Sequence, residues 1–296
     1  MTTTTPTGPD RSGPDRSGAG RRAQALLHRR PVLRRAGLLA PALVWLGLLY
    51  LVPLGFLLAT AFFDTDSFTG RITYTLTPDN VVEVLTDPAY LLTAARTIGV
   101  AVGVTVLCVL LALPLATYMA LVARPRARPV LVALVLTPLW ASYLVKVYAW
   151  RILLAPEGPL GGASPGYGWF AVIVTLTYLW LPYMVLPVYA GIDSMRGTFL
   201  EAAADLGARP WTAFRTVVLP MLGPAVAAGS VFTFSLSLGD YITVQLVGGT
   251  NQMLGNIVYS NFSTDLPFSA AVALLPLLVM GAYLLTIRRT GALERL

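Results

Sequence analysis

The chain has 296 residues, of which 56% are hydrophobic and only 12% are charged, and its mean hydropathy is +0.69. Soluble globular proteins carry about 25% charged residues, so this composition excludes a water-soluble domain and indicates an integral membrane protein. The net charge of +7 comes almost wholly from arginine, and its distribution along the chain bears on membrane orientation rather than on nucleic acid.

The first 30 residues are polar and contain Gly-Pro-Asp-Arg-Ser twice in tandem, at residues 8–12 and 13–17. Such a segment buries too little apolar area to offset its ordering entropy, so residues 1–30 are predicted to be a disordered tail, and residues 31–296 a transmembrane domain. The apolar run 37–63 is too long for the apolar part of a secretory signal and lacks a small-residue cleavage site. It is therefore predicted to be an uncleaved first span, kinked or tilted at Pro53.

Five further apolar blocks follow, and each is long enough to cross about 30 Å of hydrocarbon as a helix. They cover residues 92–122, 130–154, 169–192, 223–247 and 268–287. The expected fold is therefore all-α and membrane-integral, with six transmembrane helices. Within the second block, Gly99 and Gly103 have the spacing of a close helix contact, although glycine is also frequent in membrane helices without one.

The basic residues predict the orientation of these spans. If the N-terminus is cytoplasmic, all 21 lysines and arginines lie on the cytoplasmic side except Arg71, Arg96, Lys146 and Arg151. The positive-inside rule therefore places both termini in the cytoplasm. The loop at residues 64–90 then lies outside and is acidic; it is either a docking surface for a soluble protein or an ordinary solvated loop.

A segment between the fourth and fifth blocks, residues 193–222, is helical by pattern but too polar for a bilayer. Thr198 and Glu201 have the spacing of a capping box at a helix start, and Gly207 stands where a left-handed residue would end that helix. Pro210 is placed to open a second, amphipathic helix. The prediction is a cytoplasmic loop made of a short helix, a sharp turn and a second helix.

This loop resembles the EAA loop of bacterial binding-protein-dependent ABC importer permeases, in which Glu-Ala-Ala is followed by Gly, Phe and Leu-Pro. The matching residues are Glu201, Ala202, Ala203, Gly207, Phe214, Leu219 and Pro220. The resemblance implies a type I importer permease in the bacterial plasma (inner) membrane, whose loop docks on a separate ATPase and moves the membrane helices. The implied partners are two ATP-binding cassette ATPase subunits, a second permease subunit, identical or different, an extracytoplasmic solute-binding protein and membrane lipid, with no nucleic acid.

Four further stretches resemble the spermidine/putrescine importer permeases, namely Pro138–Trp150, Tyr178–Pro187, Ser235–Tyr241 and Gly248–Asn256. This resemblance implies polyamine transport by alternating access, driven by the partner ATPases. Related permeases for ferric iron, sulfate or other small solutes share the scaffold, so these substrates stay open.

No catalytic, cofactor or metal site is predicted. The chain lacks the Gly-x-x-x-x-Gly-Lys-Ser/Thr phosphate loop, and it has one cysteine and one histidine, His28 in the tail. Residues 162–166 match the nucleophile elbow Gly-x-Ser-x-Gly by letters, but an intramembrane hydrolase would need a nearby histidine. A second rival, an ion-coupled secondary transporter, would normally show inverted repeats with broken helices, and the sequence shows no internal repeat.

Charged side chains inside spans are costly unless they face a cavity or a partner. Lys146 either snorkels to the surface or faces inward, and Asp240 either forms an ion pair, for instance with Lys146, or faces the substrate. Near aromatic side chains, Asp240 would offer a polyamine both charge pairing and cation–π contact, whereas Lys146 argues against a cation. The hypothetical substrate path comprises Trp140, Tyr143, Lys146, Asp240 and Tyr241.

Overall fold

The computed structural model describes residues 31–66, 69–195, 205, 207, 209, 212 and 214–289. The predicted tail and Glu201, Ala202 and Ala203 of the predicted loop lie outside the described residues. The described chain is almost entirely helical, apart from a small antiparallel pair of strands, β1 (Asp64–Thr65) and β2 (Ile72–Thr73). It divides into two units at Leu57 and Leu58, and each is described by itself.

The first unit is a single apolar helix with one irregular turn. It comprises α2 (Pro31–Leu46), the π turn η1 (Gly47–Leu51) and the start of α3 (Val52–Thr60). Pro53 has no N–H to donate, and its ring crowds the carbonyl of Leu49, four residues earlier. The irregular backbone near this proline is a π turn that ends at Leu51, two residues before Pro53. The kink or tilt predicted at Pro53 stays a prediction.

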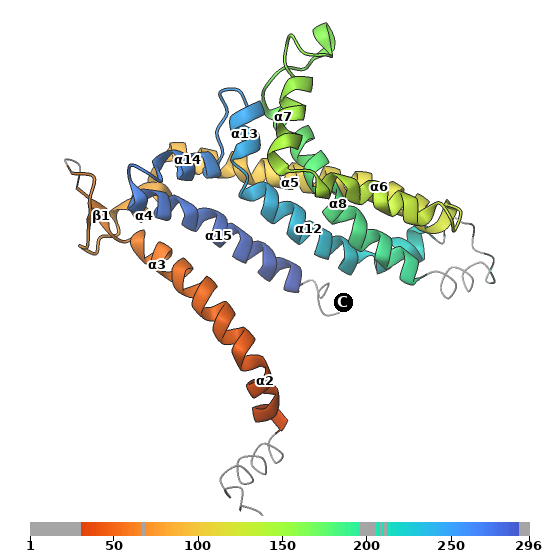
Figure 1. Ribbon diagram of the computed structural model, residues 1–296, viewed down its shortest axis with the longest axis horizontal. Coiled ribbons are helices and arrows are strands. Elements are labelled where there is room, and N and C mark those ends of the chain that lie inside the picture. The colour runs from red at the N-terminus through yellow and green to blue at the C-terminus, as the bar shows by residue number, and fades with distance from the viewer. Residues whose placement is uncertain are drawn as a thin grey trace, which may run out of the picture. The chain divides into compact units, whose positions relative to one another are not determined.

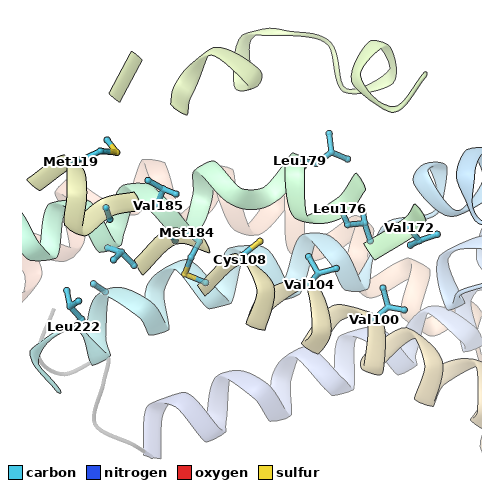
Figure 2. Close-up of a cluster of buried hydrophobic side chains, with 14 of the residues drawn as sticks. Val100, Val104, Cys108, Met119, Val172, Leu176, Leu179, Met184, Val185 and Leu222 are labelled. Carbon is cyan, nitrogen blue, oxygen red and sulfur yellow. The ribbon is translucent and has the colours of Figure 1, made fainter. Parts of the chain in front are cut away.

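Three long helices form the core of the second unit (Figure 1). They are α5 (Pro88–Thr117), which the π turn η2 (Tyr118–Val122) continues, α8 (Trp169–Ser194) and α12 (Gly223–Leu238). Figure 2 shows Val104 and Cys108 of α5 on the side that faces α8, near Leu176 and Met184. All four of these side chains are fully buried, so the apolar face of α8 lies inside the bundle rather than against lipid.

A glycine sets the distance between α8 and α12. A Cβ atom on Gly229 would lie 2.6 Å from Met184 Sδ and 3.1 Å from Met184 Cα, so α12 can approach α8 this closely only without a side chain. The Cβ positions of Gly99 and Gly103 have no neighbouring heavy atom within 4 Å. The close contact considered for that pair is therefore not made within the described chain.

A second buried cluster joins α4 (Asp79–Thr86), α14 (Leu254–Asn261) and α15 (Leu266–Arg289). Aspartates cap two helices at this end of the unit. Asp87 Oδ1 accepts the backbone N–H of Ala89 at 2.7 Å at the start of α5, and Asp265 Oδ1 accepts that of Phe268 at 3.0 Å at the start of α15. A capping carboxylate satisfies donors that the first helical turn leaves free.

The predicted third span, 130–154, is not one helix. It consists of α6 (Arg128–Trp140) and α7 (Tyr143–Leu153), which meet at 92° (Figure 1). The backbone is extended at Ala141 and Ser142, the position where α7 begins. Ser142 stands at the N-cap position of α7, where serine is a preferred residue, although its side chain makes no capping hydrogen bond.

The predicted fifth span, 223–247, is also interrupted. Helix α12 ends at Leu238, and α13 (Ile242–Val247) begins after Gly239, Asp240 and Tyr241. Glycine and aspartate both have low propensity for a helix interior, so α12 ends here. Aspartate is preferred at the start of a helix, which favours a new helix after it.

Four helices in the described chain are long and apolar enough to cross a membrane, or six if each bent pair counts as one span. The single helices are Leu39–Thr60, Pro88–Val122, Trp169–Ser194 and Leu266–Arg289. The bent pairs are α6 with α7, and the segment of η4 (Phe214–Val218) and α11 (Leu219–Met221) with α12. The expected all-α membrane fold is confirmed.

Candidate functional site

The two helix breaks lie side by side and are joined by hydrogen bonds. Tyr143, the first residue of α7, donates its hydroxyl to Oδ2 of Asp240, and the same hydroxyl lies 2.8 Å from Oγ1 of Thr243. Oδ1 of Asp240 accepts the backbone N–H of Thr243 at 2.8 Å and so caps α13. We call Tyr143, Asp240 and Thr243 the break cluster.

Asp240 is almost completely buried, with 7% of its surface exposed. Both of its carboxylate oxygens have partners within the break cluster. Lys146, one turn further along α7, is similarly buried, yet these two described residues form no ion pair with each other. The ion pair considered from the sequence is therefore not made. The partners of the carboxylate are a hydroxyl and a backbone amide, and each oxygen keeps a further lone pair.

A pocket of about 190 Å³ opens beside the break cluster. Tyr143, Asp240 and Tyr241, three of the five residues predicted for the substrate path, line it together with Trp180. Its remaining lining residues are Leu236, Gly239 and Ile242. We call this space the Asp240 pocket. It presents one carboxylate among aromatic rings, a combination suited to an organic cation.

Trp140 and Lys146, the other two residues predicted for the path, do not line the Asp240 pocket. Trp140 is the last residue of α6 and is 88% exposed, whereas Lys146 is buried within α7. In one continuous helix, Trp140 and Lys146 would lie fewer than two turns apart on the same element. The 92° turn between α6 and α7 instead places them on two helices that run in different directions.

Trp180 of α8 is a pocket residue that the sequence reasoning did not assign. Its ring stacks on that of Tyr143, with centroids 6.0 Å apart and planes 14° from parallel. Its indole nitrogen is buried and has no hydrogen-bond partner among the described residues. The available signal was its place in the aromatic stretch Tyr178–Pro187, but only the contact with α7 identifies it as a site residue.

Helix α14 supports the pocket from behind. The side-chain amide of Asn256 donates to the backbone carbonyl of Tyr241 at 3.0 Å, and the ring of Tyr259 stacks on that of Tyr241 at 4.6 Å. Asn256, the last residue of the Gly248–Asn256 stretch, therefore stabilises the interrupted backbone between α12 and α13.

A second pocket, of about 330 Å³, lies beyond α13 and has no charged lining residue. Amides and hydroxyls supply its polar groups, from Gln245, Thr250, Asn251, Gln252, Asn256, Tyr259 and Ser260. Since Asn256 and Tyr259 also support the backbone of Tyr241, this polar pocket and the Asp240 pocket share their structural supports.

The predicted loop is described only in part. Gly207 has φ +79°, the left-handed conformation predicted for a helix-ending glycine. Glu201, Ala202 and Ala203 lie outside the described residues. Arg209 and Asp205, on either side of Gly207, are exposed.

The end of the loop is anchored in the helical core. Phe214 is half-buried against the core cluster, whereas Leu219 and Pro220 are exposed. Val218, just before Leu219, and Leu222, two residues after Pro220, are buried. Val218 and Leu222 belong to the core cluster that α5 and α8 also form.

Ser164, the central residue of the nucleophile-elbow letters, is a turn residue. Its hydroxyl donates to the carbonyl of Leu154 at 2.8 Å and accepts the N–H of Gly166 at 3.2 Å. It follows a single 3₁₀ turn, η3 (Gly161–Ala163), and not the strand that an elbow requires. These contacts assign the serine to loop structure.

Comparisons with known proteins agree with this architecture. Residues 109–290 match the family described as "Binding-protein-dependent transport system inner membrane component". The chain is 40% identical, over 88% of its length and 90% of the relative's, to the inner membrane ABC transporter permease protein YdcU of Escherichia coli (strain K12). It is 30% identical, over 84% of its length and 94% of the relative's, to the spermidine/putrescine transport system permease protein PotB of the same strain.

A solved structure shares the fold. It is the crystal structure of a bacterial ABC transporter involved in the import of the acidic polysaccharide alginate, and the TM-score is 0.66. The superposition covers 91% of this chain and 98% of that one, at 17% sequence identity.

Proposed function

This chain belongs to the family of binding-protein-dependent transport system inner membrane components, and from that premise we propose that it carries a polyamine, such as spermidine or putrescine, across the bacterial inner membrane. Importer permeases of this family work with ATPase subunits and a binding protein. We propose two ATPase subunits, a second permease subunit, identical or different, and an extracytoplasmic binding protein as its partners.

The Asp240 pocket is the observation that carries the polyamine proposal. Among the described residues, Asp240 is the only charged one that lines it, and the rings of Tyr143, Trp180 and Tyr241 surround the space. A cation over an aromatic face gains about 0.5–2 kcal/mol, more when water is excluded, and a carboxylate adds charge pairing. The PotB relative, whose name states spermidine and putrescine transport, supports the same substrate class.

The lengths of the interrupted helices support a water-filled path at the pocket. Helix α6 has 13 residues and α12 has 16, which correspond to about 20 Å and 24 Å of rise. Both are shorter than the roughly 30 Å hydrocarbon layer, so a helix that starts at the cytoplasmic surface ends within it. Irregular backbone is tolerated at that depth only where it is buried in protein or lines an aqueous cavity.

Energy enters, in this proposal, through the loop around Glu201–Gly207 on the cytoplasmic side. The ATPases push this loop as they close on ATP, and the buried side chains of Val218 and Leu222 pass the movement to the helical core. The helices then expose the Asp240 pocket alternately to the two sides of the membrane, with both termini in the cytoplasm.

Two alternatives are separated from this proposal by experiment. A permease for ferric iron, sulfate or another small solute would use the same scaffold, and the fold is shared with an alginate importer. An ion-coupled carrier would work without an ATPase. Broken helices, which are typical of such carriers, do not distinguish a carrier from an importer here, because two spans of the described chain are broken.

The test is uptake by the complete transporter. The chain is purified with the ATPase, second permease and binding protein encoded beside it, and is reconstituted into liposomes that contain ATP. We expect uptake of radiolabelled spermidine or putrescine that requires ATP and binding protein and is insensitive to proton and sodium gradients. Gradient-driven uptake without ATP would overturn the importer mechanism, and ATP-dependent uptake of sulfate or iron without polyamine uptake would overturn the substrate.

A further inference from the structure

We propose that Tyr183 and Phe232 extend the substrate path from Trp180, at the edge of the Asp240 pocket, as a series of ring faces for an organic cation. This inference rests on the proposed polyamine function and adds two residues to those that line the pocket. We call Tyr143, Trp180, Tyr183 and Phe232 the aromatic series.

The rings follow one another at nearly constant spacing across three helices. The Tyr143 and Trp180 centroids are 6.0 Å apart, those of Trp180 and Tyr183 are 6.0 Å apart, and those of Tyr183 and Phe232 are 6.1 Å apart. These distances lie within the range of contacting aromatic pairs. The aromatic series therefore connects α7 through α8 to α12 without an interruption by another residue type.

The series leads away from the helix breaks and along the bundle. Trp180 and Tyr183 are three residues apart and so share one face of α8. Phe232 precedes the end of α12 at Leu238 by six residues, which is about 9 Å of helix. A cation that leaves Asp240 along these rings thus travels toward the loop end of α12.

The two ends of the series are accessible in the isolated chain. Trp180 lines the Asp240 pocket, and Phe232 is 55% exposed although it belongs to a core helix. A pair of rings on the same helices makes a matched comparison. Trp150 and Tyr178 are in contact, with centroids 5.5 Å apart, but neither lines the Asp240 pocket.

Trp180 contributes its ring and not its hydrogen-bond donor. The buried indole N–H has no partner among the described residues, so hydrogen bonding within that part of the chain does not account for a tryptophan here. Buried tryptophans usually place this group on an acceptor. A role in cation binding does explain a tryptophan at the edge of the Asp240 pocket, because indole gives the strongest cation–π contact of the natural side chains.

Spermidine uptake by the complete reconstituted transporter tests the inference. The variants are Trp180→Leu and Tyr183→Leu, with Trp180→Phe to keep a ring and Trp150→Leu as the matched control. We expect the two leucine variants of the series to raise the KM for spermidine about thirtyfold, the size of one desolvated cation–π contact of about 2 kcal/mol. Trp180→Phe, which keeps a weaker ring contact, should fall between Trp180→Leu and the unsubstituted protein. Trp150→Leu should stay within about twofold of the unsubstituted protein. ATPase activity stimulated by the binding protein is measured in parallel to confirm that each variant assembles.

The outcomes of these measurements separate the ring series from the polyamine function. If Trp180→Leu and Trp150→Leu change uptake equally, or if Trp180→Phe is as impaired as Trp180→Leu, the ring series is not the path, while the polyamine function stands. If the unsubstituted transporter takes up no polyamine under conditions in which it hydrolyses ATP, the proposed function fails first and the inference with it.

Discussion

Asp240 has two roles that one substitution can separate. Its Oδ1 caps α13 through the N–H of Thr243, and its carboxylate gives the pocket the one charged group found among its described lining residues. Asparagine caps helices about as well as aspartate does, whereas alanine cannot, so the cap and the charge can be removed in turn.

Asp240→Asn is therefore expected to leave the thermal stability of the purified protein nearly unchanged and to reduce polyamine uptake about tenfold or more. Asp240→Ala is expected to lose uptake as well and, in addition, about 1 kcal/mol of stability with the lost cap. Uptake kinetics in liposomes and melting in detergent measure the two effects. Unchanged uptake kinetics for Asp240→Asn would remove Asp240 from the substrate path.

At the scale of single residues, the sequence predicted a functional role for Asp240 as one alternative but not its capping role. A carboxylate in an apolar block indicated a functional or paired residue, and the pocket around Asp240 fits the first alternative. Its capping role was not predictable, because the capped helix exists only if the fifth span is broken. Trp180 was missed for a related reason, since its value lies in a contact with Tyr143, 37 residues earlier in the chain.

At the scale of elements, the contact between α8 and α12 depends on the absence of a side chain at Gly229. The added methyl group of an alanine would meet the backbone of Met184 as well as its sulfur, so the two helices would have to move apart. Gly99 on α5 provides the matched control because its Cβ position is open.

Gly229→Ala is expected to destabilise the bundle by about 1–3 kcal/mol, the usual cost of overpacking a core, and to lower the melting temperature in detergent by several degrees. Gly99→Ala is expected to change it little and, in the exposed helix interior, to favour helix slightly. Equal melting temperatures for the two variants would contradict the close packing described for Gly229.

Predictions of elements succeeded where the cause is local. The left-handed conformation of Gly207 follows from the sterics of glycine itself. The spans 130–154 and 223–247 were predicted as single helices because hydropathy averaged over about 20 residues hides two or three small or polar ones. Ala141–Ser142 and Gly239–Tyr241 are interruptions of this size, and they meet only in the folded bundle.

At the scale of the whole molecule, the proposal places the Gly207 loop on the ATPase side of the membrane and the loop after α7 on the other. The sequence contains a single cysteine, Cys108, and its side chain is fully buried. Cys108→Ser therefore gives a background in which one introduced thiol reports on one position, with little disturbance to packing.

In that background, a cysteine at Asp205 or at Arg209 is expected to crosslink to the ATPase subunits of the assembled transporter, because both side chains are exposed beside Gly207. A cysteine at Leu160, which is exposed in the loop between α7 and α8, is the control and should crosslink to the binding protein or to nothing. Crosslinked products resolved by mass would contradict the proposed orientation if Leu160, and not the Gly207 loop, joined an ATPase.

The all-α membrane fold was accessible from the sequence because the length of an apolar block determines whether it can cross a bilayer as a helix. The orientation predicted from the arginines stays a prediction. The convergence of Tyr143 and Asp240 was not, since these residues are 97 positions apart and a single sequence carries no signal for such a pair. Fold and family therefore followed from patterns, whereas the pocket required coordinates.

The π turn at Phe214–Val218, just before Pro220, has a mechanical consequence. A π turn holds one more residue than an α turn, so tightening it by that residue advances the preceding chain by about 1.5 Å and swings it by about 100° around the axis. In the proposed coupling, a push on the Gly207 loop that tightened this turn would therefore also rotate the preceding chain about the helix axis.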